Sequence, residues 1–304
     1  MSVNKTLICV VGPTAIGKTV LAIELAKAFN TEIISADSRQ FFKEMTVGTA
    51  VPSQAELSAV THHFIQSKSI FEDYSVGDFE REAMELLSEL FETRDVVVLA
   101  GGSGLYVDAI VKGLDDFPKV ASEIRIQLKT ELEEQGIEFL QRELKNVDPE
   151  SYHRIDIQNQ QRLIRALEIY RGTGKPYSSF LQNKLAKRPF KTLYVGLEAN
   201  RDVVYERINS RVDLMIENGL VEEAKCLMPH KDLNALQTVG YKELFEWLDQ
   251  KTTFEKAVEE IKKNTRRFAK RQGTWFRKNE DIQWFDHTVE PSEIISFLRQ
   301  KKGL

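Results

Sequence analysis

A glycine-rich segment near the amino terminus carries the residue types that bind phosphate. Residues 12–19 read Gly-Pro-Thr-Ala-Ile-Gly-Lys-Thr and fit the pattern G-x-x-x-x-G-K-[ST] in full. In such a P-loop, backbone N–H groups at the start of a helix surround an anion. The lysine adds a charge for phosphate oxygens, and the last hydroxyl can hold Mg²⁺. The segment predicts a diphosphate- or nucleotide-binding (ATP-type) site formed by Gly12, Pro13, Thr14, Ala15, Ile16, Gly17, Lys18 and Thr19.

An acidic residue that could act beside this loop follows the second predicted strand. A typical P-loop NTPase carries its acid at the end of another apolar strand, but the segment 96–100 runs into two glycines instead. The nearest candidate is Asp37, which opens the tetrapeptide Asp-Ser-Arg-Gln at 37–40. An acid there lies at the carboxyl edge of the sheet, where ligands bind in open α/β folds. The alternative role for Asp37 is to cap the following turn.

Alternating strand and helix patterns surround these residues. Short apolar segments rich in β-branched residues predict strands, and apolar residues spaced at the helical repeat predict helices. Their alternation predicts an α/β fold, a P-loop NTPase-like parallel sheet flanked by helices. The predicted strands are 5–11, 32–35, 96–100, 192–197 and 282–285, and the predicted helices include 18–29, 76–91 and 201–217.

One long segment interrupts this alternation. From residue 115 to residue 189 the spacing of apolar residues is helical, and no segment there resembles a strand. We therefore expect a core made of residues 1–114 and 190–304, the latter ending in long helices, with a helical insertion at 115–189.

Composition limits the class of protein. The longest apolar runs, such as 7–11 and 96–100, are far too short to span a bilayer. Residues 1–12 lack the basic and apolar regions of a secretory signal, so we expect a cytoplasmic protein with no membrane partner. With only Cys9 and Cys226, neither a disulfide framework nor a cysteine metal site is expected. The adjacent His62 and His63 do not predict a metal pair, because neighbouring side chains point apart on regular structure.

A basic segment near the carboxyl terminus stands out against the net charge of −4. Between residues 261 and 278 there are eight basic residues and no acidic one. Such a segment can contact nucleic-acid phosphates whatever the overall charge, or it can be a solvated helix face. The basic residues are Lys262, Lys263, Arg266, Arg267, Lys270, Arg271, Arg277 and Lys278.

The motifs together resemble those of the tRNA dimethylallyltransferase (IPP transferase) family. The P-loop and residues 37–40 are followed, in the order of that family, by further segments that extend the resemblance over nearly the whole chain. These segments are GGSGLY (101–106), QRLIRALEIY (161–170), RVDLMIENGLVEEA (211–224), VGYKE (239–243) and TRRFAKRQGTWFR (265–277).

This resemblance implies an enzyme that transfers a dimethylallyl group from dimethylallyl diphosphate, with Mg²⁺ as cofactor. The acceptor is N6 of adenosine 37 in the anticodon loop of tRNAs that read codons starting with U, and diphosphate is released. By the same resemblance Asp37 is the general base. Lys18 and Mg²⁺ held through Thr19 would stabilise charge on the leaving diphosphate. No obligate protein partner is implied, and we expect a monomer.

Two arginines on one predicted helix could bind the same diphosphate. Arg207 and Arg211 are four residues apart and therefore lie on one helix face. Each could bind the diphosphate with two hydrogen bonds, or both could form surface ion pairs with Glu206 and Asp213. Arg211 is favoured because it opens a segment of the family resemblance, but which arginine is the main contact stays open.

The resemblance also implies a set of tRNA contacts. A target adenine must leave the anticodon stack, so polar or planar side chains have to replace its contacts. Ser103 has a second possible role, as the N-cap of the following helix. The implied contacts are Asp37, Ser38, Arg39, Gln40, Ser103, Arg125, Gln161, Arg162, Leu163, Ile164 and Arg165.

The carboxyl-terminal segment 265–277 is expected to dock as a helix and to contact tRNA. Ile261, Phe268 and Trp275 recur every seven residues and predict a narrow apolar seam on that helix. The basic residues around the seam would then be free to contact backbone phosphates. The insertion is expected, as a hypothesis, to swing over the anticodon stem-loop.

Three other functions use parts of the same pattern. An adenylate isopentenyltransferase would share the core and the donor, but it should lack the insertion and the basic helix. A small-molecule kinase would use the loop for ATP. A tRNA-binding module could use the P-loop only as a nucleotide switch. The choice of tRNAs and the length of the prenyl chain stay open.

Overall fold

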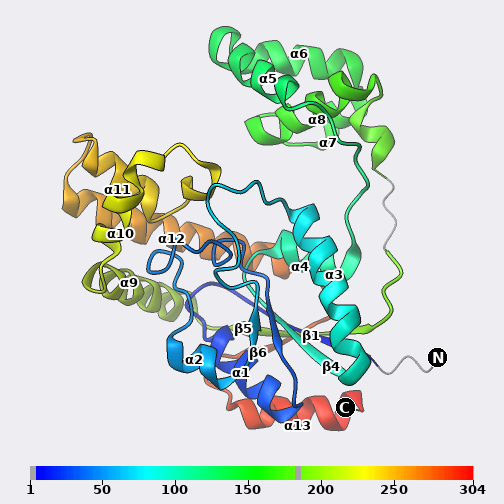
Figure 1. The fold of residues 1–304 in the computed structure, drawn as a ribbon, viewed down its shortest axis with the longest axis vertical. Coiled ribbons are helices and arrows are strands. Elements are labelled where there is room, and N and C mark those ends of the chain that lie inside the picture. Colours follow the sequence, from blue (N-terminus) through cyan, green and yellow to red (C-terminus); the bar gives the residue numbers. More distant parts are fainter. Residues whose placement is uncertain (1–4, 182–185, 304) are drawn as a thin grey trace. The chain divides into compact units, whose positions relative to one another are not determined.

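The computed structural model describes residues 5–181 and 186–303. The chain divides into two compact units, one made of Met1–Lys112 with Lys187–Leu304 and one made of Gly113–Ala186 (Figure 1). The expected insertion, 115–189, begins two residues after the start of the second unit and ends three residues after its end. We refer to the first unit as the core unit and to the second as the insertion unit.

The core unit is built on one parallel sheet of six strands. The strand order is β3-β2-β4-β1-β5-β6, and every pairing is parallel. This confirms the predicted α/β fold with a parallel sheet. The strands are β1 (Thr6–Val11), β2 (Ile33–Ser35), β3 (His62–His63), β4 (Val96–Ala100), β5 (Lys191–Glu198) and β6 (Ile282–Asp286).

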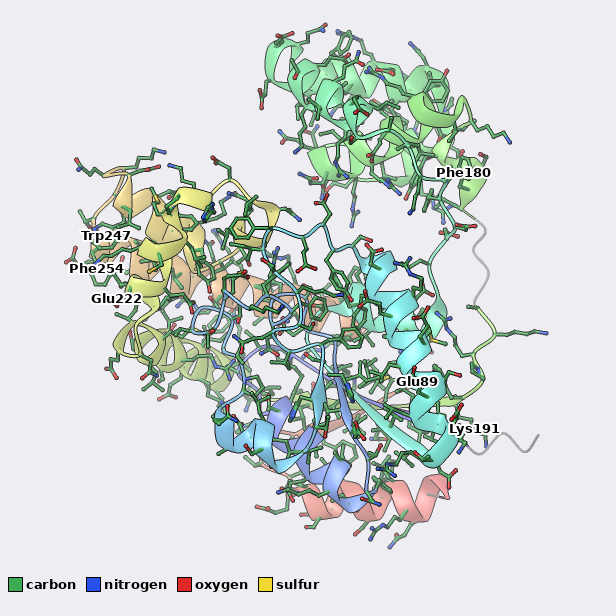
Figure 2. The ribbon with its side chains drawn as sticks, viewed as in Figure 1. Glu89, Phe180, Lys191, Glu222, Trp247 and Phe254 are labelled. Carbon is green, nitrogen blue, oxygen red and sulfur yellow. The ribbon has the colours of Figure 1, made fainter. Side chains whose placement is uncertain are left out.

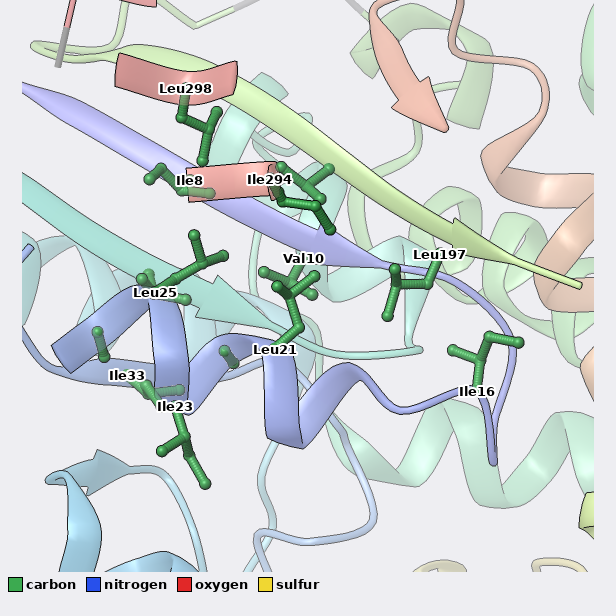
Figure 3. Close-up of a cluster of buried hydrophobic side chains, with 14 of the residues drawn as sticks. Ile8, Val10, Ile16, Leu21, Ile23, Leu25, Ile33, Leu197, Ile294 and Leu298 are labelled. Atoms are coloured by element: carbon green, nitrogen blue, oxygen red, sulfur yellow. The ribbon is translucent and has the colours of Figure 1, made fainter. Parts of the chain in front are cut away.

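Strand β1 is apolar after Thr6, because both faces of the sheet are covered. All six of its residues are buried. Ile8 and Val10 point to one face, where they pack with residues of α1 (Lys18–Ala28), α9 (Arg201–Glu217) and α13 (Pro291–Lys302). Figure 3 shows this cluster, with side chains of α1 and α13 around those of β1. A parallel strand buried on both sides reads as a continuous apolar run, which explains the strength of the sequence signal.

The second face of the sheet is covered by α3 (Val76–Thr93) and α4 (Gly104–Lys112). Helix α3 starts at a capping box in which Ser75 and Asp78 exchange hydrogen bonds. Phe41, which is 1% exposed, lies between Phe79 of α3 and Tyr106 of α4, at ring-centroid distances of 5.2 and 5.5 Å. This burial fixes the chain that follows β2 and therefore the position of residues 37–40.

A third group of helices has its own apolar core. It contains α10 (Leu220–Leu227), α11 (Tyr241–Leu248) and the first half of α12 (Phe254–Phe276), with Tyr241 fully buried. Trp247 and Phe254 join α11 to the start of α12, with ring centroids 5.1 Å apart (Figure 2). Three short helices complete the core unit: α2 (Gln54–Ala59), η2 (Met228–His230) and η3 (Asn234–Leu236).

The predicted apolar seam on α12 is wrong. Ile261 is buried, but Phe268 and Trp275 are 39% and 38% exposed. A straight helix drifts away from a seven-residue repeat, and α12 also packs on different partners along its length. Ile261 contacts the α10–α11 core, whereas further along Ala269 and Phe276 face the two sides of the sheet.

The insertion unit is helical in all its described regular elements, as the sequence predicts. It consists of α5 (Ser122–Gln135), α6 (Ile137–Val147), α7 (Pro149–Arg154), α8 (Gln160–Thr173) and η1 (Tyr177–Phe180). Its core contains leucines from α5, α6 and α8. Arg171 of α8 forms ion pairs with Glu131 of α5 and Glu143 of α6, at 2.6 and 2.5 Å. None of the helices in the described parts of the chain has the length and apolarity needed to cross a membrane.

Asp148 joins the start of α7 to η1 within the insertion unit. Its carboxylate is 1% exposed and accepts hydrogen bonds from the backbone N–H and the hydroxyl of both Ser151 and Ser178. Burial acts to raise the pKa of Asp148, but these hydrogen bonds outweigh it and hold the pKa below its ordinary value. The ionised carboxylate therefore stabilises the unit.

We expect Asp148→Asn to lower the free energy of unfolding of the insertion unit by about 1–3 kcal/mol at neutral pH. A group with a lowered folded pKa stabilises above its unfolded pKa of about 4, and this contribution is lost as pH falls through the folded pKa. The difference between variant and wild type should therefore shrink below about pH 4. Hydrogen exchange of residues 137–180 measures the effect. Asp156→Asn, at an exposed turn of the same unit, is the matched control and should change little.

Candidate active site

The P-loop lies where the sequence predicts it, between β1 and α1. Gly17 has a φ of 111°, which suits glycine, and α1 begins at the next residue, Lys18. Since Gly17 has no side chain to cap the helix, the N–H groups of the first turn are available to an anion. Lys18 donates a hydrogen bond of 2.7 Å from Nζ to the carbonyl of Pro13. The loop is therefore already closed around its lysine.

Burial shifts the titration of this lysine. The pKa of Lys18 is lowered to about 8, mainly by burial and in addition by the charge of Arg211, while the carboxylate of Asp37 acts in the opposite direction. These three charges therefore share one poorly solvated region. Bound phosphate would favour the protonated lysine.

Both arginines of α9 reach the P-loop. Arg207 donates from Nε to the carbonyl of Ala15 at 2.7 Å, and Arg211 approaches the hydroxyl of Thr14 at 3.4 Å. Burial, followed by the neighbouring Arg207, holds the pKa of Arg211 below its ordinary value. Arg207 is exposed, whereas Arg211 is half-buried. The described contacts of both arginines are with the P-loop, and the alternative of surface ion pairs with Glu206 and Asp213 is not observed among them.

Asp37 lies at the carboxyl edge of the sheet. The chain leaves β2 through Ala36, whose N–H bonds to the carbonyl of Ala100 in β4 at 2.8 Å. The Oδ1 atom of Asp37 accepts from the N–H of Arg39 at 3.2 Å, so the carboxylate also caps the next turn. Its Oδ2 atom makes no hydrogen bond with any residue that the structure describes. One oxygen is therefore held, and the other is available to a substrate.

The residues that follow Asp37 bind other parts of the protein. Arg39 donates to the carbonyl of Ala235 in η3 at 3.0 Å. The side chain of Gln40 donates to the carbonyl of Ala50 at 2.9 Å. The hydroxyl of Ser103 accepts from the N–H of Ser38 at 3.1 Å, so it joins two loops instead of capping α4. In this structure these polar groups order the walls of the site.

Gln272 is a site residue that the sequence interpretation missed. It is 6% exposed, accepts from the N–H of Thr14 at 2.8 Å, and donates to the carbonyl of Gly102 at 2.9 Å. A Cβ atom on Gly102 would lie 2.2 Å from the amide nitrogen of Gln272, so only glycine leaves room for this contact. The side-chain amide thus ties α12 to the P-loop and to the loop after β4. The sequence signal that could have located Gln272 is its position on the same face of the helix as the apolar residues Ala269 and Phe276.

Glu223 of α10 is a second residue that was missed. Its carboxylate accepts hydrogen bonds from the N–H groups of Thr46, Val47 and Gly48, at 2.8–2.9 Å, and from the hydroxyl of Tyr241 at 2.6 Å. This network fixes the loop that leads to residues 48–53, which form one wall of the site. Glu223 and Tyr241 lie within two of the segments that carry the family resemblance.

These groups surround one large pocket in the core unit. Its volume is about 1550 Å³, and the P-loop, Asp37 with the residues after it, and the loop 100–106 line it together with faces of α9, α11 and α12. Phosphate-binding groups, a carboxylate and apolar surface therefore occur in one cavity large enough for more than one substrate.

Comparison with known proteins identifies the family. The model of the IPP transferase family matches residues 40–279. The chain belongs to this family. It is 56% identical over 300 residues to a tRNA dimethylallyltransferase of Flavobacterium johnsoniae, covering 97% of each chain. It is 60% identical over 295 residues to one of Christiangramia forsetii, covering 97% of this chain and 98% of the relative.

Solved structures of IPP transferases share the fold. A tRNA isopentenylpyrophosphate transferase of Bacillus halodurans matches with a TM-score of 0.71 and 39% identity, covering 98% of this chain and 96% of that one. A eukaryotic dimethylallyltransferase described as acting on tRNA matches with a TM-score of 0.79 and 27% identity, covering 98% of this chain and 77% of that one.

The remaining expected contacts of this IPP transferase lie in the insertion unit. Glu168 of α8 is 5% exposed and pairs with Arg165 at 3.1 Å and with Arg125 of α5 at 3.6 Å. Arg125 also approaches the side chain of Gln161 at 3.5 Å. Glu168, which the sequence interpretation did not single out, therefore gathers these polar groups on one surface.

Two residues of the expected set do not face that surface. Leu163 and Ile164 are 0% and 2% exposed and belong to the core of the insertion unit. Their inclusion among RNA contacts is corrected, because the helical repeat turns them inward while Gln161 and Arg162 are exposed. The Nδ1 atom of His62 lies 2.8 Å from the carbonyl oxygen of Val60. His63 bonds to Glu32 at 2.7 Å, and no cluster of metal-binding side chains occurs in the described residues.

We expect Gln272→Leu to weaken binding of pyrophosphate about tenfold, because the N–H of Thr14 and the carbonyl of Gly102 lose their partners and the loop loses its fixed position. Calorimetric titration with pyrophosphate and Mg²⁺ measures the effect. Thr274→Ala, at an exposed position of the same helix, serves as the control. Unchanged or tighter binding in Gln272→Leu would show that the loop keeps its shape without this residue.

The affinity for pyrophosphate should fall as pH rises through about 8, the pKa of Lys18. Below this pH the lysine is charged and attracts the anion, and above it each pH unit should weaken binding by up to about tenfold. Lys18→Arg keeps its charge, so its dissociation constant should vary less with pH. Because the two proteins share any titration of pyrophosphate itself, the difference between their pH profiles isolates Lys18. Parallel profiles would contradict the assignment.

Proposed function

We propose that this chain transfers a dimethylallyl group from dimethylallyl diphosphate to N6 of adenosine 37 in tRNA and releases diphosphate. The tRNAs would be those that read codons starting with U. The observation that carries the proposal is the position of the Asp37 carboxylate. It lines the same pocket as the charged groups of the P-loop, and only its Oδ1 atom is hydrogen-bonded to a residue that the structure describes. The names of the relatives, tRNA dimethylallyltransferases, agree with this activity.

The P-loop is suited to the diphosphate of the donor. Free N–H groups at the start of α1 and the charges of Lys18 and Arg211 would bind its oxygens. Arg207 would help by holding the carbonyl of Ala15 and thus the shape of the loop. We infer that Arg211 is the direct contact and that Arg207 acts partly through the loop. Charge that develops on the leaving group would then meet donors that are already in place.

The donor set fits Mg²⁺. The hydroxyl of Thr19 lines the same pocket and offers an oxygen ligand of the kind that this ion prefers. The described residues contain no cluster of acidic or histidine side chains that could hold a metal ion alone. Phosphate oxygens and water would therefore have to complete the site, which is usual for Mg²⁺. When bound, the ion would neutralise negative charge on the diphosphate.

Asp37 would act as the base. The N6 amine of adenine is a weak nucleophile, because its lone pair is delocalised into the ring. As N6 bonds to the allylic carbon, the bond from that carbon to the diphosphate oxygen breaks and N6 must lose a proton. The Oδ2 atom of Asp37 would accept this proton. The bond from the N–H of Arg39 to Oδ1 would keep the carboxylate oriented for that step.

Both units would contact the tRNA. In the insertion unit, Arg125 and Arg165 are 40% and 39% exposed, and Glu168 holds one side of each guanidinium. Their remaining N–H groups would bind phosphates or base edges, together with Gln161 and Arg162. In the core unit, Ser38 to Gln40 and Ser103 would border the entry of the target adenine, and the basic face of α12 would contact phosphates. The proposed enzyme acts in the cytoplasm as a monomer.

We expect Asp37→Asn to lower kcat for prenyl transfer by about 10²–10⁴-fold, because the amide cannot accept the proton. The assay follows labelled dimethylallyl diphosphate with Mg²⁺ and an unmodified anticodon stem-loop carrying A36-A37-A38. RNA binding should persist in the variant. Asp73→Asn, at an exposed position outside the pocket, is the matched control and should retain activity.

The same assay separates the rival functions. Label on AMP or ATP instead of the stem-loop would indicate a free-nucleotide prenyltransferase. Phosphoryl transfer from ATP without prenyl transfer would indicate a kinase. Nucleotide-dependent RNA binding without any transfer would indicate a switch module. Full activity of Asp37→Asn would exclude Asp37 as the base. The assignment of the donor and of tRNA as substrates would still hold.

A further inference from the structure

Exposed apolar side chains gather at the pocket of the core unit. Among the described residues seven large apolar side chains are exposed, and five of them line this single pocket. Scattered exposed apolar residues are normal, but a concentration around one cavity indicates a surface that a ligand covers. The five are Val20, Leu105, Leu214, Phe268 and Trp275.

The ring of Trp275 is fixed from two sides. Its Nε1 donates to Asp108 of α4 at 3.0 Å. The indole also lies against Gly104, where a Cβ atom would come within 2.3 Å of it. Yet the residue remains 38% exposed and lines the pocket. A planar side chain that is held in place and still exposed can bind a second flat group with little loss of entropy.

Phe268 presents a second ring from the same helix. It is 39% exposed and lines the same pocket. Trp275 lies seven positions further along α12, which is nearly two turns and roughly 10 Å. The guanidinium of Arg271, between them in sequence, lies 5.7 Å from the ring centroid of Phe268. Aromatic rings interleaved with cations are the side-chain set that binds single-stranded RNA.

We propose that Phe268 and Trp275 form a stacking wall for the bases next to the target adenosine. This inference rests on the proposed function, because it assigns the recognition of the RNA substrate. When the target base leaves the stack, its neighbours lose contacts on one face. The two rings would replace those contacts, and the cations of α12 would neutralise the adjoining phosphates.

The charge around the wall favours RNA over the prenyl chain as its ligand. The guanidinium of Arg271 lines the pocket beside the ring of Phe268, and a hydrocarbon chain gains nothing from a cation there. Three other basic residues of the segment 261–278 are already in ion pairs with acidic side chains, namely Lys262, Lys263 and Arg277. The polar edge of the indole is already bonded to Asp108, so its exposed surface offers the ring to a ligand. A prenyl chain on this wall is the competing occupant that the experiment must exclude.

The test combines binding with a fluorescent base. Two anticodon stem-loops carry 2-aminopurine, one on each side of the target adenosine, and are titrated with wild type, Trp275→Ala, Phe268→Ala and Trp275→Phe. The fluorescence of 2-aminopurine is quenched when the base stacks. Phe71→Ala is the matched control, because Phe71 is 61% exposed but lies outside the pocket. The KM for dimethylallyl diphosphate is measured for every protein, and melting curves verify folding.

If the wall stacks bases, each alanine variant should bind the stem-loop about tenfold more weakly, and at least one probe should brighten in the complex. Trp275→Phe keeps a ring but loses the bond to Asp108, so it should retain most of the affinity. The control and the KM for the donor should not change. Equal loss in Trp275→Phe and Trp275→Ala would overturn the inference, since it would assign the effect to the Asp108 contact.

Two further results would also overturn it. Unchanged RNA affinity and quenching in the alanine variants would show that the bases do not touch the wall. A raised donor KM with unchanged RNA affinity would place the prenyl chain there. In both cases wild type still prenylates the stem-loop, so the proposed function survives. Failure of wild type to bind or prenylate the stem-loop would instead reject the proposed function and the inference with it.

Discussion

The register of β1 between β4 and β5 is the constraint on which the site depends. Val10 pairs with Ala100 and Val11 with Gly196, so the loops after these strands leave the sheet at one edge. Parallel strands bring their carboxyl ends together, and the P-loop and the loop after β4 consequently meet. Gln272 then joins both loops to α12 through one side-chain amide. Residues far apart in the chain thus form one rigid cradle.

Around the P-loop, the positively charged groups of Lys18 and Arg211 lie close together and are partly removed from water. Lys18 and Arg211 are both less basic than in water, and burial is the main cause for each. Neighbouring cations in a poorly solvated place are stabilised by an anion, so the apo pocket is already arranged for a diphosphate. Asp37 is the opposing charge, and its Oδ2 atom makes no hydrogen bond with any residue that the structure describes. The same electrostatic arrangement therefore suits both the leaving group and the base.

The surfaces proposed to recognise the RNA substrate are built differently in the two units. In the insertion unit a buried carboxylate, Glu168, organises exposed arginines. In the core unit α12 combines buried, aromatic and basic faces, because it crosses three apolar clusters along its length. A buried acid positions the arginines by direct pairing, whereas Trp275 is positioned by packing against Gly104 and by its hydrogen bond to Asp108. The first kind of surface is sensitive to salt and the second is much less so.

Local patterns in the sequence were sufficient for five of the six parallel strands, the P-loop and the helical insertion, because burial of a strand on both faces and the helical repeat leave direct signals. The two-residue strand β3 was not predicted. The family segments also located Asp37 and Arg211, and the helical spacing from Arg211 located Arg207. The roles of Gln272, Glu223 and Glu168 depend on partners far along the chain, and no local pattern encodes such pairings. For the same reason the predicted seam through Phe268 and Trp275 failed. Which face of α12 is buried depends on the clusters it meets, and only the tertiary structure brings those together.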